Sequence, residues 1–152
     1  MRALFLRLFF KGKELEHLNV LIVESGMAPY EKEINGLEEM QATVGGRITA
    51  IYPYEEQVAL VCNDEGIHLG MEFNRSVGNG YGGVFGTFFV CGLGEEDFCS
   101  LSPEQMERFK KEFHQAEILI AAKGNTPITL KVDPRPATPP KQPKRPPKTP
   151  VR

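Results

Sequence analysis

Cysteines, histidines and clustered acidic residues are the side chains of this sequence whose types could support chemistry. Cys62 and Cys91 lie in apolar runs, where a free cysteine usually behaves as a small hydrophobic side chain. Cys99 lies shortly before an expected helix start, and a helix N-terminus can lower the pKa of a thiol. The acidic residues at 95–97 oppose this effect, because negative charge disfavours the thiolate. A cysteine-dependent enzyme at Cys99 is therefore kept only as an alternative.

Metal and hydrolase chemistry have weaker support in the residue spacing. The three histidines and three cysteines show no zinc-type spacing, and Ser100 and Ser102 have no neighbouring histidine or lysine base. Acidic pairs in turns can bind cations, but solvated turn acids are far more common. We therefore predict no catalytic residue, no metal and no cofactor.

The glycine-rich segment Gly78–Gly83 (GNGYGG) is similar in composition to a phosphate-binding loop. Phosphate loops follow a strand and open a helix, and the P-loop also requires Gly-Lys-Ser/Thr. Here a strand follows instead, which favours a flexible loop without a ligand. The alternative is a small-ligand or signal-nucleotide binding module that uses Arg75, Asn79 and Tyr81.

Charge is strongly partitioned along the chain, although the net charge is only −2. Residues 18–103 contain 13 acidic and three basic residues, whereas residues 134–152 contain six basic residues and no acid. Such an acidic body could occupy the basic nucleic-acid channel of another protein. Turns present side chains from a rigid scaffold, so they should supply the contacts. The expected partner-binding residues are Glu55, Glu56, Asp64, Glu65, Glu95, Glu96 and Asp97.

The best-specified local structure is a buried strand followed by a capped helix. Residues 85–91 are aromatic, β-branched or small, which predicts an interior strand with Phe88 and Phe89 buried on opposite faces. Ser102, Pro103 and Gln105 form a helix N-cap, first turn and capping box. An apolar stripe of Met106, Phe109, Phe113, Ala116 and Ile120 then predicts a helix from 103 to about 123, with Gly124 at its C-cap.

The remaining segments predict an α+β fold. Strands are expected at 18–24, 29–34, 47–52, 57–62 and 67–73, a helix at 35–44, a flexible loop at 74–83 and an edge strand at 128–132. The resulting order is ββα-βββ-βα: a single mostly antiparallel sheet of about five or six strands with two helices.

Three regions are expected along the chain. Residues 1–17 (MRALFLRLFFKGKELEH) are an N-terminal extension, with a short signal, an amphipathic anchor or a translated leader ahead of a start codon at Leu18 as alternatives. Residues 18–133 form the acidic domain. Residues 134–152, with eight of the twelve prolines, are expected to be a disordered basic tail. No apolar run is long enough to span a membrane, and the odd cysteine count indicates a cytoplasmic protein.

Several blocks, in their order, resemble domain-of-unknown-function family 3846. These blocks are VLIVESGMAPYEKEINGLEEMQATVGGRITAIYPYEEQVALVCNDEG at 20–66, FNR at 73–75 and GTFFVCGLGEEDFCSLSPEQ at 86–105. The resemblance covers about residues 18–115, and family members usually have a more ordinary polar segment in place of 76–83. The family has no established catalytic residues. It implies a small accessory protein of phages and conjugative elements of gut bacteria, many of which blunt host defences.

Charge and resemblance together favour a non-enzymatic accessory protein that inhibits a host defence factor, of the anti-CRISPR or anti-restriction type, by protein–protein binding. The expected partner is a nuclease or effector of the host, without sequence-specific nucleic-acid binding or membrane binding. The ligand-binding module and the cysteine enzyme remain the alternatives, and the oligomeric state is open.

Overall fold

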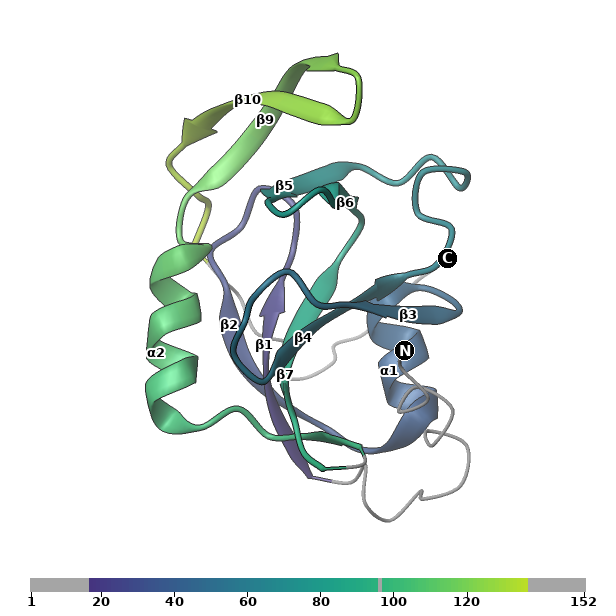
Figure 1. Cartoon of the computed structure of the whole chain (residues 1–152), viewed down its shortest axis with the longest axis vertical. Helices are drawn as coiled ribbons and strands as arrows, with labels where there is room; N and C mark the ends of the chain where they lie inside the picture. Colours follow the sequence, from purple (N-terminus) through teal and green to yellow (C-terminus); the bar gives the residue numbers. More distant parts are fainter. Residues whose placement is uncertain (1–16, 96, 137–152) are drawn as a thin grey trace, which may run out of the picture.

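A computed structural model describes residues 17–95 and 97–136 of the chain. Its centre is a six-stranded antiparallel sheet in the order β2-β1-β7-β4-β3, with β8 pairing on β7 (Figure 1). The strands are β1 (Leu18–Val23), β2 (Tyr30–Ile34), β3 (Ile48–Ile51), β4 (Val58–Asn63), β7 (Phe88–Leu93) and β8 (Phe98–Cys99). The α+β class and the main antiparallel sheet are confirmed.

Strand β7 lies between β1 and β4, so the expectation of an interior strand is confirmed. Phe88 and Phe89 are both fully buried, and they belong to the two separate hydrophobic clusters on opposite faces of the sheet. The strand is shorter than expected, because Phe85 ends the preceding strand. Gly86, at φ 93°, then breaks the extended conformation before β7 begins.

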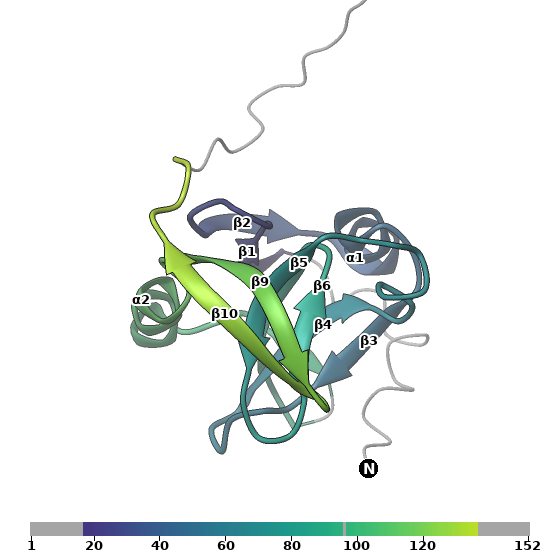
Figure 2. The same cartoon turned by 90° about the horizontal axis from the view of Figure 1, so that it is seen from above.

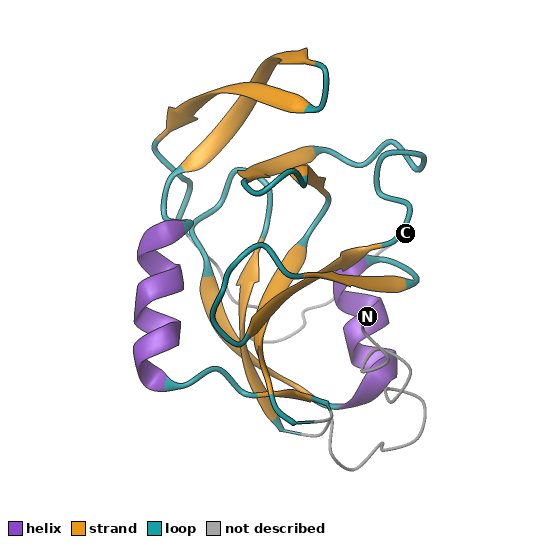
Figure 3. Cartoon of the chain, in the orientation of Figure 1, coloured by secondary structure: helices purple, strands orange, loops and turns teal. Residues whose placement is uncertain are grey.

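One helix covers each face of this sheet (Figure 3). Helix α1 (Gly36–Val44) buries Met40 and Val44 on the Phe89 side and ends at Gly45, whose φ is 84°. Helix α2 (Pro103–Glu112) packs on the Phe88 side. Ser102 Oγ accepts from Gln105 N, and Gln105 Oε1 accepts from Ser102 N, so the predicted capping box is confirmed.

The C-terminal half of the expected long helix is instead a β-hairpin. Helix α2 ends at Glu112, and β9 (Ala116–Lys123) pairs with β10 (Thr126–Val132) in a separate two-stranded sheet. Gly124 therefore lies in a hairpin turn, with φ 62°, and caps no helix. The expected edge strand at 128–132 exists, but it pairs with β9 and does not join the main sheet.

The glycine-rich region is also a hairpin rather than a flexible loop. Strands β5 (Phe73–Val77) and β6 (Gly82–Phe85) pair in a third sheet, so the expectation of a single sheet is corrected. The expected strand at 67–73 is wrong, because residues 64–70 form turns and Gly70 has φ 73°. Seen from above, β9 and β10 lie across β5 and β6, with α1 and α2 on either side (Figure 2).

Candidate functional site

Arg75, a predicted ligand-binding residue, lies in β5 and is completely buried. Its Nη2 donates to the carbonyl oxygens of Phe113 (2.7 Å) and Met27 (2.8 Å), and its Nη1 donates to Asn74 Oδ1 (2.8 Å). Burial lowers the pKa of the guanidinium to about 10, while the charge of Glu117 opposes this shift. The side chain therefore links the β1–β2 turn to the end of α2 through hydrogen bonds to their backbone carbonyls, and its guanidinium is not available at the surface for a ligand.

Asn79 and Tyr81 lie at the surface, in the turn between β5 and β6. Asn79 Nδ2 donates to Pro53 O, and Tyr81 Oη accepts from Tyr52 N at 3.4 Å. Both side chains thus hold the β5–β6 turn against the segment that follows β3. The structure brings Asn79 and Tyr81 together but places Arg75 in the interior, so the three do not form one binding site.

Five of the predicted partner-binding acids lie in two separate places. Leu93 N donates to Gln57 O at 2.9 Å, which joins the segment before β4 to the segment after β7. Glu55 precedes this contact by two residues and Glu95 follows it by two, and both are exposed. Glu56 forms an ion pair with Arg108 of α2. These acids therefore lie near one another on the side of the sheet where β4 begins.

Asp64 and Glu65 lie at the other end of β4, six residues away. At about 3.3 Å per residue, that separation is roughly 20 Å. Arg47 Nη2 lies 3.0 Å from Asp64 Oδ2 and 3.4 Å from Glu65 Oε2. This pair is therefore both distant from Glu55 and Glu95 and partly neutralised.

The acidic run after β7 is not one exposed cluster. Asp97 is only 6% exposed, and its backbone oxygen accepts from Gly94 N at 2.8 Å, so it belongs to the turn that precedes β8. Glu96 lies outside the described residues. Of this run, the structure thus presents Glu95 at the surface.

Further acids, which the sequence interpretation missed, are exposed where the two helices begin, one helix on each face of the sheet. Asn35 Oδ1, just before α1, accepts from His17 N (2.7 Å), and Leu101 N, just before α2, donates to Asn19 O (3.0 Å). Both helices therefore start beside the first residues of β1, at the lower end of the molecule in Figure 1. Their first turns expose Glu38, Glu39 and Glu104. Acids in first helical turns complement the helix dipole, a signal that was visible in the sequence. We call Glu38, Glu39, Glu95 and Glu104 the acidic end.

Cys99 lies in β8 and is partly buried. Burial raises the pKa of its thiol, the opposite of the activation that a helix N-terminus would produce. Burial also raises the pKa of Cys62 to about 11 and that of Cys91 well above the usual value. Among residues 17–95 and 97–136, no three His, Cys, Asp or Glu side chains are grouped to hold a metal ion.

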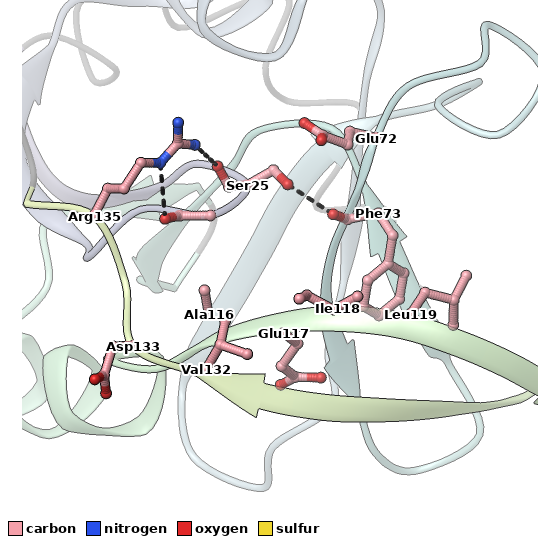
Figure 4. Close-up of a pocket in the computed structure, with 11 residues that line it drawn as sticks. Ser25, Glu72, Phe73, Ala116, Glu117, Ile118, Leu119, Val132, Asp133 and Arg135 are labelled. Carbon is pink, nitrogen blue, oxygen red and sulfur yellow. Dashed lines mark hydrogen bonds between the residues drawn. The ribbon is translucent and has the colours of Figure 1, made fainter.

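A cavity of about 440 Å³ lies at the base of the β9–β10 hairpin (Figure 4). Phe73, Ile118 and Val132 line its apolar part, and Ser25 Oγ donates to Phe73 O at 2.8 Å. Arg135 closes one side, with Nη2 donating to Ser25 O (3.4 Å) and Nε to Gly26 O (3.5 Å). These contacts fix the hairpin base to the β1–β2 turn.

A family model for a domain of unknown function (DUF3846) matches residues 18–114. The chain belongs to this family. The matched region contains the main sheet and both helices, whereas the β9–β10 hairpin lies beyond it. Comparison with curated proteins and with solved structures found no match. Within the described part of the chain, no helix has the length and apolar character needed to cross a membrane.

Proposed function

We propose that this DUF3846 protein is a non-enzymatic accessory protein of a mobile genetic element that binds a basic, nucleic-acid-handling defence protein of the host. It acts by occupying the partner's basic channel, as an anti-CRISPR or anti-restriction inhibitor does. Family membership is consistent with this role but assigns no activity.

The acidity of residues 18–103 is the observation that supports this proposal. The rest of the family domain, residues 104–114, adds Arg108, Lys110 and Lys111, of which Arg108 pairs with Glu56 and Lys110 with Glu31. Residues 18–103 contain only three basic residues. Of these, Arg75 is buried and Arg47 is paired with Asp64 and Glu65, which leaves Lys32 as an exposed cation of that region. A surface with so few cations attracts a basic partner through long-range fields.

The acidic end, with the exposed Glu55 beside it, is the part of this surface that best fits a channel. Both helix starts and the turn after β7 expose their carboxylates at the same end of the sheet, with one helix on each face. The ligand-binding alternative is less well supported, because Arg75 is bonded to backbone carbonyls. The cysteine-enzyme alternative is less well supported because burial raises the pKa of Cys99.

Charge reversal tests the proposal. Because Asp97 is buried, the informative variant combines Glu55→Lys with Glu95→Lys, both of which are exposed. We expect this variant to melt as the native chain does but to lose inhibition of CRISPR and restriction nucleases. Inhibition by the native chain should weaken as salt increases, because exposed charges are screened over about 8–10 Å at physiological ionic strength.

The matched control is Asp64→Lys with Glu65→Lys, which makes the same change in net charge at the opposite end of β4. It should retain most of the inhibition. The proposal fails if inhibition survives both high salt and the Glu55/Glu95 reversal, or if no nuclease is inhibited by the native chain.

A further inference from the structure

The β9–β10 hairpin has two distinct faces, which its register defines, because residues opposite each other on paired strands share a face. On one face Glu117 lies opposite Lys131, and Leu119 lies opposite Thr129. On the other face Ile118 lies opposite Leu130. A register shift between Ile128 and Thr129 marks a bulge, beyond which Ile128 lies opposite Ala121.

The first face is attached to the body of the protein. Glu117 Oε1 accepts from Ser76 Oγ (2.7 Å) and Ser76 N (3.0 Å), and Glu117 is only 8% exposed. Leu119 and Pro127 line a cavity of about 200 Å³ together with Phe73 of β5. We call this side the inner face, because its side chains are engaged with β5 and its surroundings.

The second face, the outer face, is apolar and exposed to solvent. Its exposed fractions are 52% for Ile118, which also borders the cavity at the hairpin base, 62% for Ile120, 46% for Ile128 and 54% for Leu130. These four are the majority of the seven large hydrophobic residues that are exposed in the described chain. Exposed apolar residues are usually scattered singly on a soluble protein, and a contiguous group marks an interaction surface.

We propose that the outer face of the β9–β10 hairpin binds the same face of a second copy of this chain. Two small sheets would then stack face to face about 10 Å apart, as in a β-sandwich. A two-fold axis makes such a contact self-complementary, because each patch meets its own copy. The eight aliphatic side chains become a shared core.

Charge favours a second copy as the occupant. The outer face has one charged residue, Lys123, at the hairpin tip opposite Thr126. In an antiparallel two-fold arrangement the two tips lie at opposite ends of the interface, so these cations stay apart. The hairpin also lies at the upper end of the molecule, and the helices begin at the lower end (Figure 1). Dimerisation would therefore keep the acidic ends of the two copies far from each other.

The size of the surface agrees with a modest dimer. A standard interface buries about 800 Å² per partner and uses roughly 20–30 residues on each side. The hairpin extends from Ala116 to Val132, and only about half of these residues belong to the outer face, because side chains alternate between the two faces of a strand. The outer face alone is therefore smaller than a standard interface, which predicts a weak dimer that dissociates on dilution.

Sedimentation velocity of the full chain, from micromolar to millimolar concentration, tests this proposal. We expect the mass to rise from 17.0 kDa toward twice that value as concentration increases. Combining Ile128→Glu with Leu130→Glu should keep the chain monomeric, since buried charges at the centre of the interface are unfavourable. The matched control is Leu69→Glu, at a residue 57% exposed outside the hairpin, which should dimerise as the native chain does.

Milder variants keep the test valid if the double glutamate variant does not fold. Ile120→Thr with Ile128→Thr retains β-branched side chains in the strands and should weaken dimerisation at least about tenfold, which is 1.4 kcal/mol. Circular dichroism and melting temperature verify the fold of each variant. A native chain that stays monomeric throughout, or a dimer unaffected by every hairpin substitution, would overturn the proposal.

Flotation with phosphatidylcholine vesicles separates self-association from membrane binding. We expect the native chain to remain unbound while it dimerises. Vesicle binding by a monomeric native chain that Ile128→Glu with Leu130→Glu abolishes would mean that a lipid surface covers this face, and would contradict the proposal. None of these measurements requires a defence protein, so they are independent of the proposed inhibition.

Discussion

Single residues of this protein change role according to whether the fold buries them. Arg75 was a plausible ligand contact from its place beside a glycine-rich segment, because arginine is usually exposed. In the structure its guanidinium donates to Met27 O and Phe113 O, which belong to segments 48 and 38 residues away. Asp97 is likewise buried, although it belongs to a run of acidic residues that the sequence suggested would be exposed. Burial of this kind depends on tertiary packing, so local sequence could not identify it.

Cys99 provides a residue-scale prediction, because its pKa direction determines its reactivity. Burial raises the pKa of this thiol, so at neutral pH a smaller fraction is thiolate than in free cysteine. Iodoacetamide should therefore modify native Cys99 more slowly than free cysteine at pH 7.5, and the rate should increase as the pH rises past 9. Mass spectrometry of the alkylated peptides measures the rate.

A Cys99→Ser variant is the control for this labelling, because Cys62 and Cys91 are buried and should react more slowly still. Modification of Cys99 faster than free cysteine at neutral pH would contradict the direction of the shift. Such a result would also restore the cysteine-dependent enzyme as a candidate.

At the scale of elements, contiguous motifs were predictable and pairings between distant segments were not. Ser102, Pro103 and Gln105 define the start of α2 through contacts within four residues. The end of α2 was misjudged because Ala116 and Ile120 continue the helical spacing of Phe109 and Phe113. Those residues form a strand because β10 pairs with them, and helical periodicity does not report that pairing.

The central strand β7 gives the element-scale prediction. Phe88 and Phe89 are fully buried on opposite faces, so truncation of either leaves a cavity in a different core. Phe88→Ala and Phe89→Ala should each lower the free energy of unfolding by about 3–5 kcal/mol. Urea denaturation measures both. Phe85→Ala, at a partly exposed position three residues earlier, should cost clearly less. Equal losses at all three positions would mean that burial in β7 is not what determines stability here.

At the scale of the whole molecule, the protein consists of a family domain with a hairpin fixed onto it. Among the described residues, neither of the two hydrophobic cores includes a residue after Phe113, and the family match ends at residue 114. The hairpin is held by Glu117 on Ser76 and by Arg135, whose backbone N donates to Gly26 O and whose backbone O accepts from Ala28 N. The contact between Gln57 and Leu93 likewise joins segments that are distant in the sequence. The sequence alone therefore could not show that the acidic turns at residues 55 and 95 lie near each other.

This arrangement predicts that the family domain folds without the hairpin. A chain ending at His114 should unfold cooperatively but at a lower temperature than one ending at Pro136. Losing the hairpin contacts should cost about 1 kcal/mol for each hydrogen bond to Ser76, Gly26 and Ala28. Calorimetry of the two chains measures the difference, and Glu117→Ala in the longer chain isolates the contribution of the hydrogen bonds to Ser76.

The shorter chain should also lose concentration-dependent dimerisation while retaining its acidic end. If it has no cooperative transition, the hairpin is an integral part of the domain, and Phe73, which lies beneath it, is the buried residue whose exposure would explain the loss.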